Sequence, residues 1–249
     1  KLYLRPALGN IPLETLKAHT VQRLYNSLSQ EHDGQPALSA KTIKNIHGVL
    51  HKALKQSVLI GYLRTNPTEA CILPRIIRKE MHPLEEDQVA VFLREVQGHP
   101  HEYLYKIALF TGLREGEVLG LGWEHIDFQT GTLTVKRQLR REQKKGGEYY
   151  FSPPKNNKSR CLTLAPSVIQ LFRLQKLEQN SMRMEASDAW EEHGLIFTNQ
   201  TGGYLSYRTV YDCFKRIVRN IGAPATRFHD LRHTFAVASI KSGDDIKTV

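Results

Sequence analysis

The chain has 249 residues and 40% hydrophobic content, which is enough for two domains of ordinary size or for one larger domain. Its three cysteines are odd in number and far apart, which argues against a disulfide framework and a zinc cluster, and no apolar run is long enough to span a bilayer. The net charge of +10 favours a polyanionic partner such as nucleic acid over a neutral or cationic one.

The N-terminal third carries most of the excess charge. Residues 1–80 hold 12 basic and 5 acidic residues, whereas residues 81–249 hold 23 and 20. Helical patterns fill residues 1–72, and the clearest helix is predicted from about Ser39, a candidate N-cap, to about Leu59, just before Gly61. At 100° per residue its apolar side chains share one side, and its basic side chains lie within about 100° of one another on the other side. We define the basic stripe as Lys41, Lys44, His51, Lys52 and Lys55.

The basic stripe suits a helix that lies along a phosphate backbone, because its cations would face the phosphates while the opposite side packs in a core. Gly48 lies inside the stripe, where the missing side chain would let a backbone come close. Taken alone, the stripe is equally compatible with a solvated helix face.

The segment from Cys71 to Pro83, with the sequence CILPRIIRKEMHP, has two prolines and no helical periodicity. It predicts a linker over residues 74–83, between a domain of residues 1–73 and a second domain of residues 84–249. Arg75, Arg78 and Lys79 make the linker basic enough to lie on DNA itself.

The second domain is expected to be mostly helical, with a small antiparallel sheet in its first half, so that the whole chain is mainly α. Helices are predicted over about 85–97, 101–112, 115–121, 166–180, 206–221 and 229–241, and strands over about 132–138, 148–151 and 160–164.

Three stretches of this domain contain candidates for phosphate chemistry. In Thr111-Gly-Leu-Arg-Glu-Gly-Glu117, Arg114 follows a helix-ending glycine, where the next helix can hold its guanidinium rigidly against a phosphoryl group. In His229-Asp-Leu-Arg-His233, the i, i+3 spacing sets His229 and Arg232 on one helical face. Each signal alone has a plainer interpretation, a surface arginine or a partly buried histidine.

Lys155 follows Pro153-Pro154 between two predicted strands. A lysine at the tip of a hairpin can enter a groove and deliver a proton to a departing oxygen, although most basic hairpins are simply solvated.

The order of these motifs is more specific than any one of them. T-G-L-R-x-G-E, then a hairpin lysine in P-K-x-x-x-S-R, then H-x-L-R-H-T resembles the tyrosine recombinases, and more narrowly the integrases of phages and conjugative transposons. The resemblance spans nearly the whole chain, because residues 6–13 and the helix after Ser39 are similar to the core-DNA-binding domain of that family. It implies an N-terminally incomplete core-DNA-binding domain at 1–73 and a catalytic domain at 84–249.

The resemblance also implies a role for each motif residue. Arg114 and Arg232 would clamp the scissile phosphate, His229 would assist proton transfer, and Lys155 would protonate the leaving 5′ oxygen. Glu117 would support Arg114, and His233 would pack beneath the site.

The implied reaction is attack by a tyrosine hydroxyl on a DNA phosphodiester, which gives a 3′-phosphotyrosine and then religation to another strand. Because the covalent intermediate keeps the bond energy, no nucleotide cofactor is expected. No metal is expected either, since the cationic side chains supply the positive charge.

The nucleophile itself is not found in these 249 residues. In the family it follows H-x-x-R, whereas here the last tyrosine is Tyr211 and the sequence ends at Val249, 17 residues after Arg232. Assigning the role to Tyr204, Tyr207 or Tyr211 would require a new topology. We therefore expect that this chain binds DNA without cutting it, and that the catalytic domain is truncated before its tyrosine.

The expected partners are double-stranded DNA at element ends and attachment sites, further copies of the chain in a dimer to tetramer, and an excisionase-type accessory protein. The expected location is the bacterial cytoplasm, on the nucleoid. Three alternatives stay open: a non-cleaving DNA-binding regulator or decayed recombinase of the same fold, a type IB topoisomerase, and a basic helical interaction protein.

Overall fold

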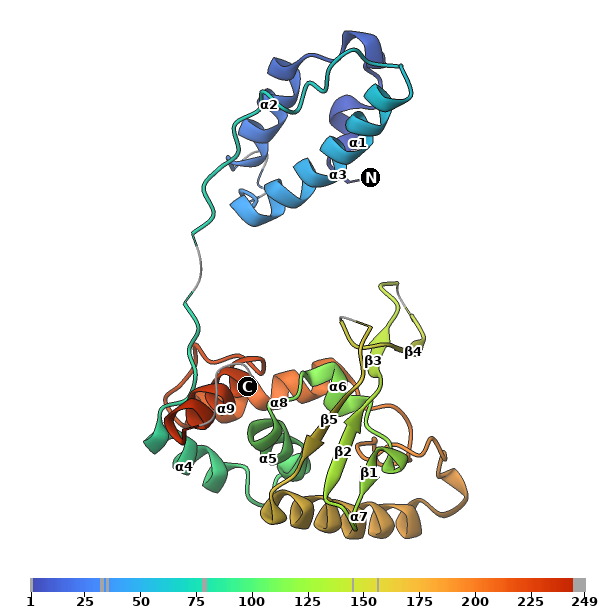
Figure 1. Ribbon diagram of the computed structural model, residues 1–249, viewed down its shortest axis with the longest axis vertical. Coiled ribbons are helices and arrows are strands. Elements are labelled where there is room, and N and C mark those ends of the chain that lie inside the picture. Colours follow the sequence, from blue (N-terminus) through green and yellow to red (C-terminus); the bar gives the residue numbers. More distant parts are fainter. Residues whose placement is uncertain are drawn as a thin grey trace. The chain divides into compact units, whose positions relative to one another are not determined.

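The computed structural model describes residues 2–31, 34, 36–77, 80–144, 146–155 and 157–243 (Figure 1). The chain divides into two compact units, Lys1–Glu80 and Met81–Val249, here called unit 1 and unit 2. Helices dominate both units, and the strands form small antiparallel sheets, so the predicted mainly α fold class is confirmed. Among the described residues, no helix has both the length and the apolar character needed to cross a membrane.

The described part of unit 1 contains three α-helices and one 3-10 turn. They are α1 (Leu4–Leu8), η1 (Leu13–Thr15), α2 (Ala18–Leu28) and α3 (Ala40–Leu59). Ser39 is the N-cap of α3, as predicted, because its hydroxyl accepts a hydrogen bond from the Thr42 backbone N–H at 3.2 Å. The apolar side of α3 packs on α2 in a core that contains Val21, Leu24, Tyr25, Ile43, Leu50 and Leu54.

Hydrogen bonds fix the chain at both ends of the predicted linker. Gln22 on α2 bonds both backbone groups of Ile72, and Leu73 packs against the core of unit 1. At the other end, the carbonyl of His82 accepts from Thr226, and the backbone N–H of Leu84 donates to Thr234 at 2.9 Å. The described chain is thus tied to unit 1 up to Leu73 and to unit 2 from His82.

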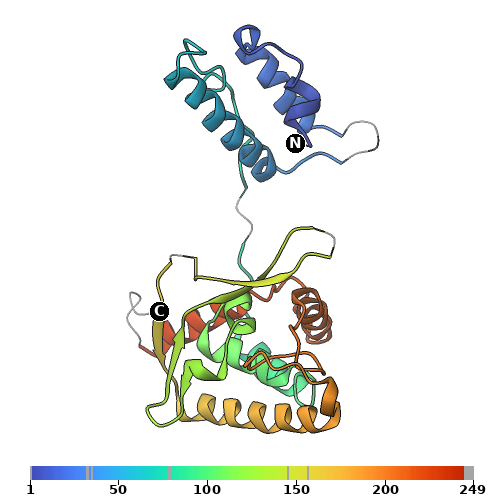
Figure 2. The same ribbon diagram turned by 90° about the vertical axis from the view of Figure 1, so that its right-hand side faces the viewer.

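Unit 2 contains six α-helices in its described part. They are α4 (Glu86–Glu95), α5 (Glu102–Thr111), α6 (Glu115–Leu119), α7 (Pro166–Ala186), α8 (Tyr207–Asn220) and α9 (Asp230–Lys241), with short 3-10 turns η2 (Trp123–His125) and η3 (Ser187–Ala189). Every helix predicted for this domain is present, and α7 extends beyond the predicted end at residue 180. Six of the ten residues of α5 are buried, which makes it the central helix, and α7 runs across one end of the unit in both Figure 1 and Figure 2.

The strands in the described residues of unit 2 form two sheets. A three-stranded sheet has the order β1-β2-β5, and a two-stranded hairpin pairs β3 with β4. The strands are β1 (Ile126–Asp127), β2 (Thr132–Val135), β3 (Gln138–Arg141), β4 (Tyr149–Ser152) and β5 (Arg160–Thr163).

The prediction of one strand over residues 132–138 is wrong. The chain changes sheets at Lys136 and Arg137, between β2 and β3. Arg137 Nε donates to the carbonyl of Gly120 at 3.0 Å, and its Nη2 lies 3.1 Å from a carboxylate oxygen of Glu124. These two contacts of Arg137 direct the chain toward α6 and η2 between the end of β2 and the start of β3. As a result, β2 pairs with β5, while β3 pairs with β4.

Candidate functional site

The candidate site begins where α5 ends. Gly112 is the C-cap of α5, with a φ of +60°, and a Cβ placed there would lie 2.6 Å from Phe235 on α9. Glycine is therefore required both by the left-handed backbone and by the close approach of α9. Two residues later Arg114 is the N-cap of α6, so the sharp turn places its guanidinium at the junction of α5, α6 and α9.

Glu117 is the centre of the polar network at this junction. It is 1% exposed, and its carboxylate accepts hydrogen bonds from the backbone N–H of Arg114 at 3.0 Å and from Arg114 Nη1 at 2.9 Å. Arg160, the first residue of β5, donates to both carboxylate oxygens at 2.9 and 2.7 Å. The carboxylate thus holds two guanidinium groups from segments 46 residues apart in fixed orientations.

Burial alone would raise the pKa of Glu117, but the hydrogen bonds and charges of Arg160 and Arg114 outweigh it and hold the pKa at about 2. The carboxylate is therefore ionised at neutral pH. Arg114 and Arg160 keep about a third of their side-chain surface exposed, 36% and 31%, so both guanidinium groups retain donors that can reach a ligand.

Arg232 joins the two arginines from α9. Its Nη1 donates to the carbonyl of Gly112 at 2.6 Å, which fixes the side chain against the end of α5. Its pKa is lowered by burial and then by repulsion from Arg114 and Arg160. Arg160 and Arg232 together line a cleft of about 490 Å³ between β5 and α9. Three cations held this close, with one buried carboxylate between them, favour an anionic ligand.

His229 is the N-cap of α9, and its ring lies 5.1 Å from that of His233 in an edge-to-face arrangement. Partial burial lowers the pKa of His229 first, and the charges of His233, Arg232 and Arg114 lower it further. Beneath it, the fully buried Asp230 accepts three hydrogen bonds from Arg227, which fixes the start of α9. His229 is thus a neutral imidazole at pH 7, free to accept a proton beside the arginines.

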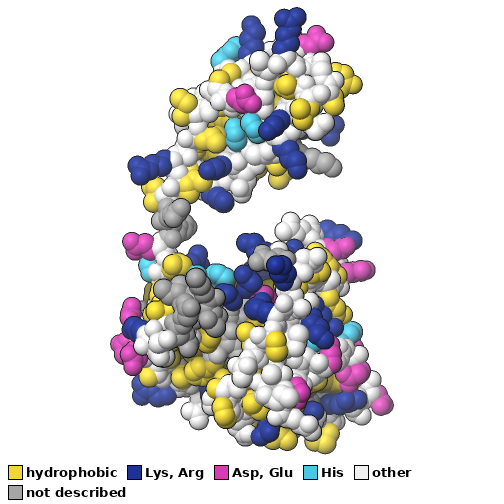
Figure 3. All heavy atoms as spheres, in the orientation of Figure 1, with side chains coloured by type: hydrophobic (Ala, Val, Ile, Leu, Met, Phe, Trp, Pro, Cys, Tyr) yellow, Lys and Arg dark blue, Asp and Glu magenta, His cyan; other side chains and the backbone are white. Residues whose placement is uncertain are grey.

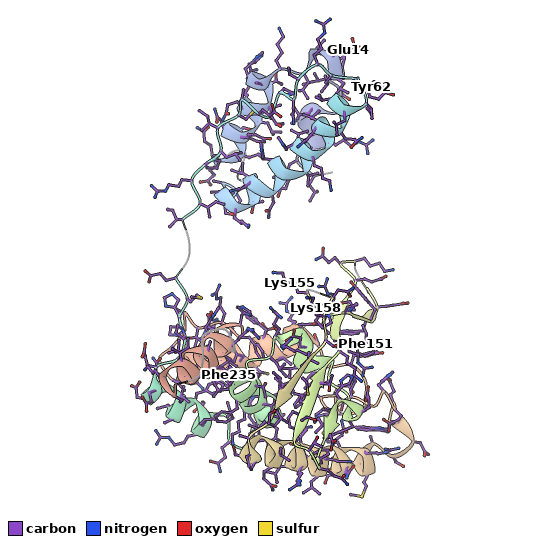
Figure 4. All side chains as sticks on the ribbon, viewed as in Figure 1. Glu14, Tyr62, Phe151, Lys155, Lys158 and Phe235 are labelled. Carbon is purple, nitrogen blue, oxygen red and sulfur yellow. The ribbon has the colours of Figure 1, made fainter. Side chains whose placement is uncertain are left out.

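The structure brings Arg114, Glu117, His229 and Arg232 together, with His233 packed on His229. Lys155 is exposed on the loop between β4 and β5, and Figure 4 shows Lys155 and Lys158 together on that loop. Within the described part of the chain, no hydrogen bond or ion pair joins Lys155 to the other four. Its predicted role stays a prediction.

Arg160 is the site residue for which sequence reasoning assigned no role. It is the last residue of the P-K-x-x-x-S-R motif, next to a hairpin of the basic kind that is usually solvated, whereas the structure places it on Glu117. The serine-arginine pair that ends P-K-x-x-x-S-R is the signal that marks it.

The residues of the predicted basic stripe lie on α3 of unit 1. Lys41, Lys44, Lys52 and Lys55 are exposed, and His51 is half-buried. Arg75 is exposed, while Arg78 and Lys79 lie outside the described residues. Figure 3 shows histidine and basic side chains side by side on the visible face of unit 1.

Glu115, next to Arg114, has the opposite character to Glu117. Its Oε1 is buried without a hydrogen-bond partner in the described part of the chain, and burial raises its pKa to about 7. In the unfolded chain it titrates near its ordinary value, so the folded state binds the extra proton between pH 4.5 and pH 7.

We expect the free energy of unfolding to fall by about 3 kcal/mol as the pH rises from 4.5 through 7, because the carboxyl group that is neutral in the fold then becomes a buried charge. Urea denaturation at several pH values should show that Glu115→Gln removes this fall. Glu185→Gln, at an exposed position of α7, is the matched control. Equal pH dependence of unfolding in Glu115→Gln and the unmodified chain would contradict the assignment.

Comparison with known proteins matches this architecture. Residues 82–249 match the model of the phage integrase family. The chain is 28% identical over 258 aligned residues to the tyrosine recombinase XerC-like protein of Caldanaerobacter subterraneus subsp. tengcongensis, an alignment that covers 97% of this chain and 65% of that protein.

Solved structures share the fold. The Tn1549 transposon integrase in complex with transposon right end DNA superposes with a TM-score of 0.82 at 23% identity, covering 99% of this chain and 80% of that one. A lambda integrase tetramer bound to a Holliday junction gives 0.64 at 20% identity, covering 98% and 66%. The chain spans 59% to 66% of the length of the first three curated relatives, a recombinase and two integrases.

Proposed function

Because this chain belongs to the phage integrase family of tyrosine recombinases, we propose that it binds duplex DNA at the ends of a mobile element and that the full-length protein cuts and rejoins strands there for integration and excision. The observation that carries the proposal is the meeting of Arg114, Arg232 and His229, with Arg160 and Glu117 behind them, at one junction of α5, α6 and α9. A binding-only protein has no need of such a convergent cationic site.

In the proposed reaction Arg114 and Arg232 donate hydrogen bonds to the non-bridging oxygens of the scissile phosphate. The charge on these oxygens grows as a fifth oxygen approaches phosphorus, so rigid donors stabilise the transition state more than the ground state. Glu117 supplies the rigidity, because it fixes Arg114 through two hydrogen bonds and is itself fixed by Arg160.

The proton steps are assigned to His229 and Lys155. As the tyrosine oxygen bonds to phosphorus, its proton passes to the neutral imidazole of His229, and the bond from phosphorus to the 5′ oxygen breaks. Lys155 gives the departing 5′ oxygen its proton and so leaves a 5′ hydroxyl. Religation reverses these steps with a different 5′ hydroxyl. The tyrosine is proposed to belong to the longer protein, and the chain of 249 residues is proposed to bind without cleaving.

The two units take different parts in this proposal. We assign residues 1–73 as the core-DNA-binding domain, 74–83 as the linker and 84–249 as the catalytic domain. Strand exchange between two duplexes takes one site per cleaved strand, so the protein is proposed to act as a dimer to tetramer on DNA in the bacterial nucleoid, with an excisionase-type partner for excision. A non-cleaving regulator or decayed recombinase of the same fold is the alternative, and it would bind DNA without forming a covalent adduct.

The binding half of the proposal predicts a steep salt dependence. A plot of the logarithm of the DNA-binding constant against the logarithm of the salt concentration has a slope of about −0.9 for each phosphate that the protein neutralises. Replacing both Lys44 and Lys52 by glutamine should therefore make this slope less steep by about 2. Fluorescence anisotropy with a labelled duplex, selected from a randomised pool by the unmodified chain, measures it. Arg173→Gln, at an exposed position of α7, should leave the slope unchanged. Binding that keeps its strength at high salt would refute the interpretation.

A further inference from the structure

Two histidines on α3 are held by polar partners at the edge of the unit 1 core. His47 Nδ1 lies 3.1 Å from the Tyr25 hydroxyl on α2, and His51 Nδ1 lies 2.8 Å from the Thr68 hydroxyl. The two rings stack with their centroids 5.4 Å apart. Both side chains are half-buried, unlike the exposed lysines on the same helix. These rings are therefore positioned by the fold, whereas the lysines form no side-chain hydrogen bond among the described residues.

Polar groups of the segment 66–68 occupy Nδ1 of His51. The Thr68 hydroxyl lies 2.8 Å from this nitrogen and itself donates to the side-chain oxygen of Asn66 at 2.7 Å, and Asn66 Nδ2 lies 3.3 Å from the same nitrogen. These contacts leave Nε2 as the other ring nitrogen. In the described part of the chain Nε2 has no hydrogen-bond partner in either histidine, and it is available to a ligand.

The surroundings of the pair are cationic. Gly48 lies one turn after Lys44 and one turn before His51 and Lys52, so these three side chains surround it on the helix surface. A Cβ at Gly48 would meet no atom within 4 Å, and nothing in the fold requires glycine there. A glycine inside a helix is unfavourable relative to alanine, so its presence here points to something outside the chain that comes close.

The other charged and titratable groups near the pair are few. Helix α3 contains no Asp or Glu. Tyr25 comes from α2, Cys71 lies near Tyr25, and the segment that carries Asn66 and Thr68 continues into the exposed Glu69, which forms no ion pair with either histidine among the described residues. Among the described residues, no carboxylate forms an ion pair with either imidazole.

We propose that Lys44, His47, His51 and Lys52 form a phosphate-binding subsite over Gly48, in which a backbone phosphate of duplex DNA binds the Nε2 edge of the histidine pair and is bound together with a proton. The inference rests on the proposed function, because the phosphate belongs to the bound duplex. It adds His47 to the predicted DNA contacts and gives His51 a specific role.

Proton uptake follows from the surroundings of the pair. Burial lowers the pKa of His47, and the neighbouring His51 and Lys44 lower it further, so His47 is neutral in the free protein at pH 7. A phosphate placed at Nε2 stabilises the imidazolium and reverses these effects. Binding should consequently weaken as the pH rises through the range in which histidine titrates.

Isothermal titration of the 249-residue chain with the selected duplex, in two buffers of different ionisation enthalpy at pH 7.5, measures the protons taken up. We expect about half a proton or more per bound chain, and an affinity that falls about tenfold from pH 6 to pH 8. The double variant His47→Gln/His51→Gln should lose both effects. His19→Gln, at an exposed position of α2, should keep them.

The outcomes separate this inference from the proposed function. If no duplex can be selected, the proposed function fails. If a duplex binds with salt dependence but with the same heat in both buffers, only the phosphate subsite is overturned, and this result needs no variant that has to fold. Inorganic phosphate bound as tightly as the duplex would instead indicate a small-anion site and would also overturn it.

Gly48→Ala gives an independent test of the close approach. The variant should unfold at higher denaturant concentration, since alanine favours the helix, and yet bind the duplex several times more weakly. Unchanged affinity in Gly48→Ala would show that no phosphate approaches this face.

Discussion

Arg232→Ala is expected to reduce covalent adduct formation by the full-length protein about a hundredfold to a thousandfold, the usual loss when one transition-state donor is removed. The guanidinium is fixed by the carbonyl of Gly112 and lies among the charges of Arg114 and Arg160, so the fold sets the position of this donor. A suicide duplex, nicked so that the cleaved strand cannot religate, measures the adduct.

Two controls sharpen this experiment. Arg232→Lys keeps the positive charge but loses the planar guanidinium with its paired donors. Adduct formation by this variant should still fall at least about tenfold. Arg173→Ala removes an exposed arginine from α7 and should cut normally. Duplex affinity should change little in all three variants because many phosphates contribute to it. Undiminished adduct in Arg232→Ala would refute the role in cleavage.

Glu117→Ala is expected to lower the free energy of unfolding by about 3 to 5 kcal/mol, the usual cost of removing one partner from a buried ionic network. The carboxylate holds two guanidinium groups and a backbone N–H, and its loss leaves them facing one another. Chemical denaturation at neutral pH measures the difference.

Glu124→Ala is the matched control for this substitution. Glu124 pairs with Arg137 at 3.1 Å, but it is 54% exposed, so its removal should cost no more than about 1 kcal/mol. The contribution of Glu117 to the free energy of unfolding should also depend on pH. It should be complete above pH 4.5 and be lost as the pH falls toward about 2. Equal losses in the two variants would show that Glu117 is not the centre of a buried network.

Much of the fold was predictable from the sequence because its local signals agree with its packing. The Ser39 cap and the glycine that ends α5 indicate helix boundaries that the structure contains, and the apolar side of α3 is the side that packs in the core. The prediction of one strand over 132–138 was wrong, because the alternation of apolar and polar side chains does not show where a strand ends and the chain pairs with a different strand. That break depends on Arg137 reaching Gly120 and Glu124, which are brought close only by the folded unit.

The site residues that stand in ordered motifs could be predicted from the sequence. The residues whose charge state depends on burial could not. Arg114, His229 and Arg232 stand in recognisable motifs, and the structure brings them together. The contrast between Glu115 and Glu117 does not appear in the sequence, since both are acidic residues of one short helix. Only the fold gives one of them two arginines and leaves the other buried without a hydrogen-bond partner for Oε1 in the described part of the chain.

The central claim is that Arg114 and Arg232 act on the charge of one phosphodiester. Cleavage of a suicide duplex in which only the scissile phosphate is replaced by a neutral methylphosphonate tests it directly. With one oxygen charge removed, full-length protein carrying Arg114→Ala or Arg232→Ala should recover most of the lost adduct, and only when the substitution is at the cleaved position. If methylphosphonate at no position restores cleavage in either variant, the two arginines do not share that phosphate.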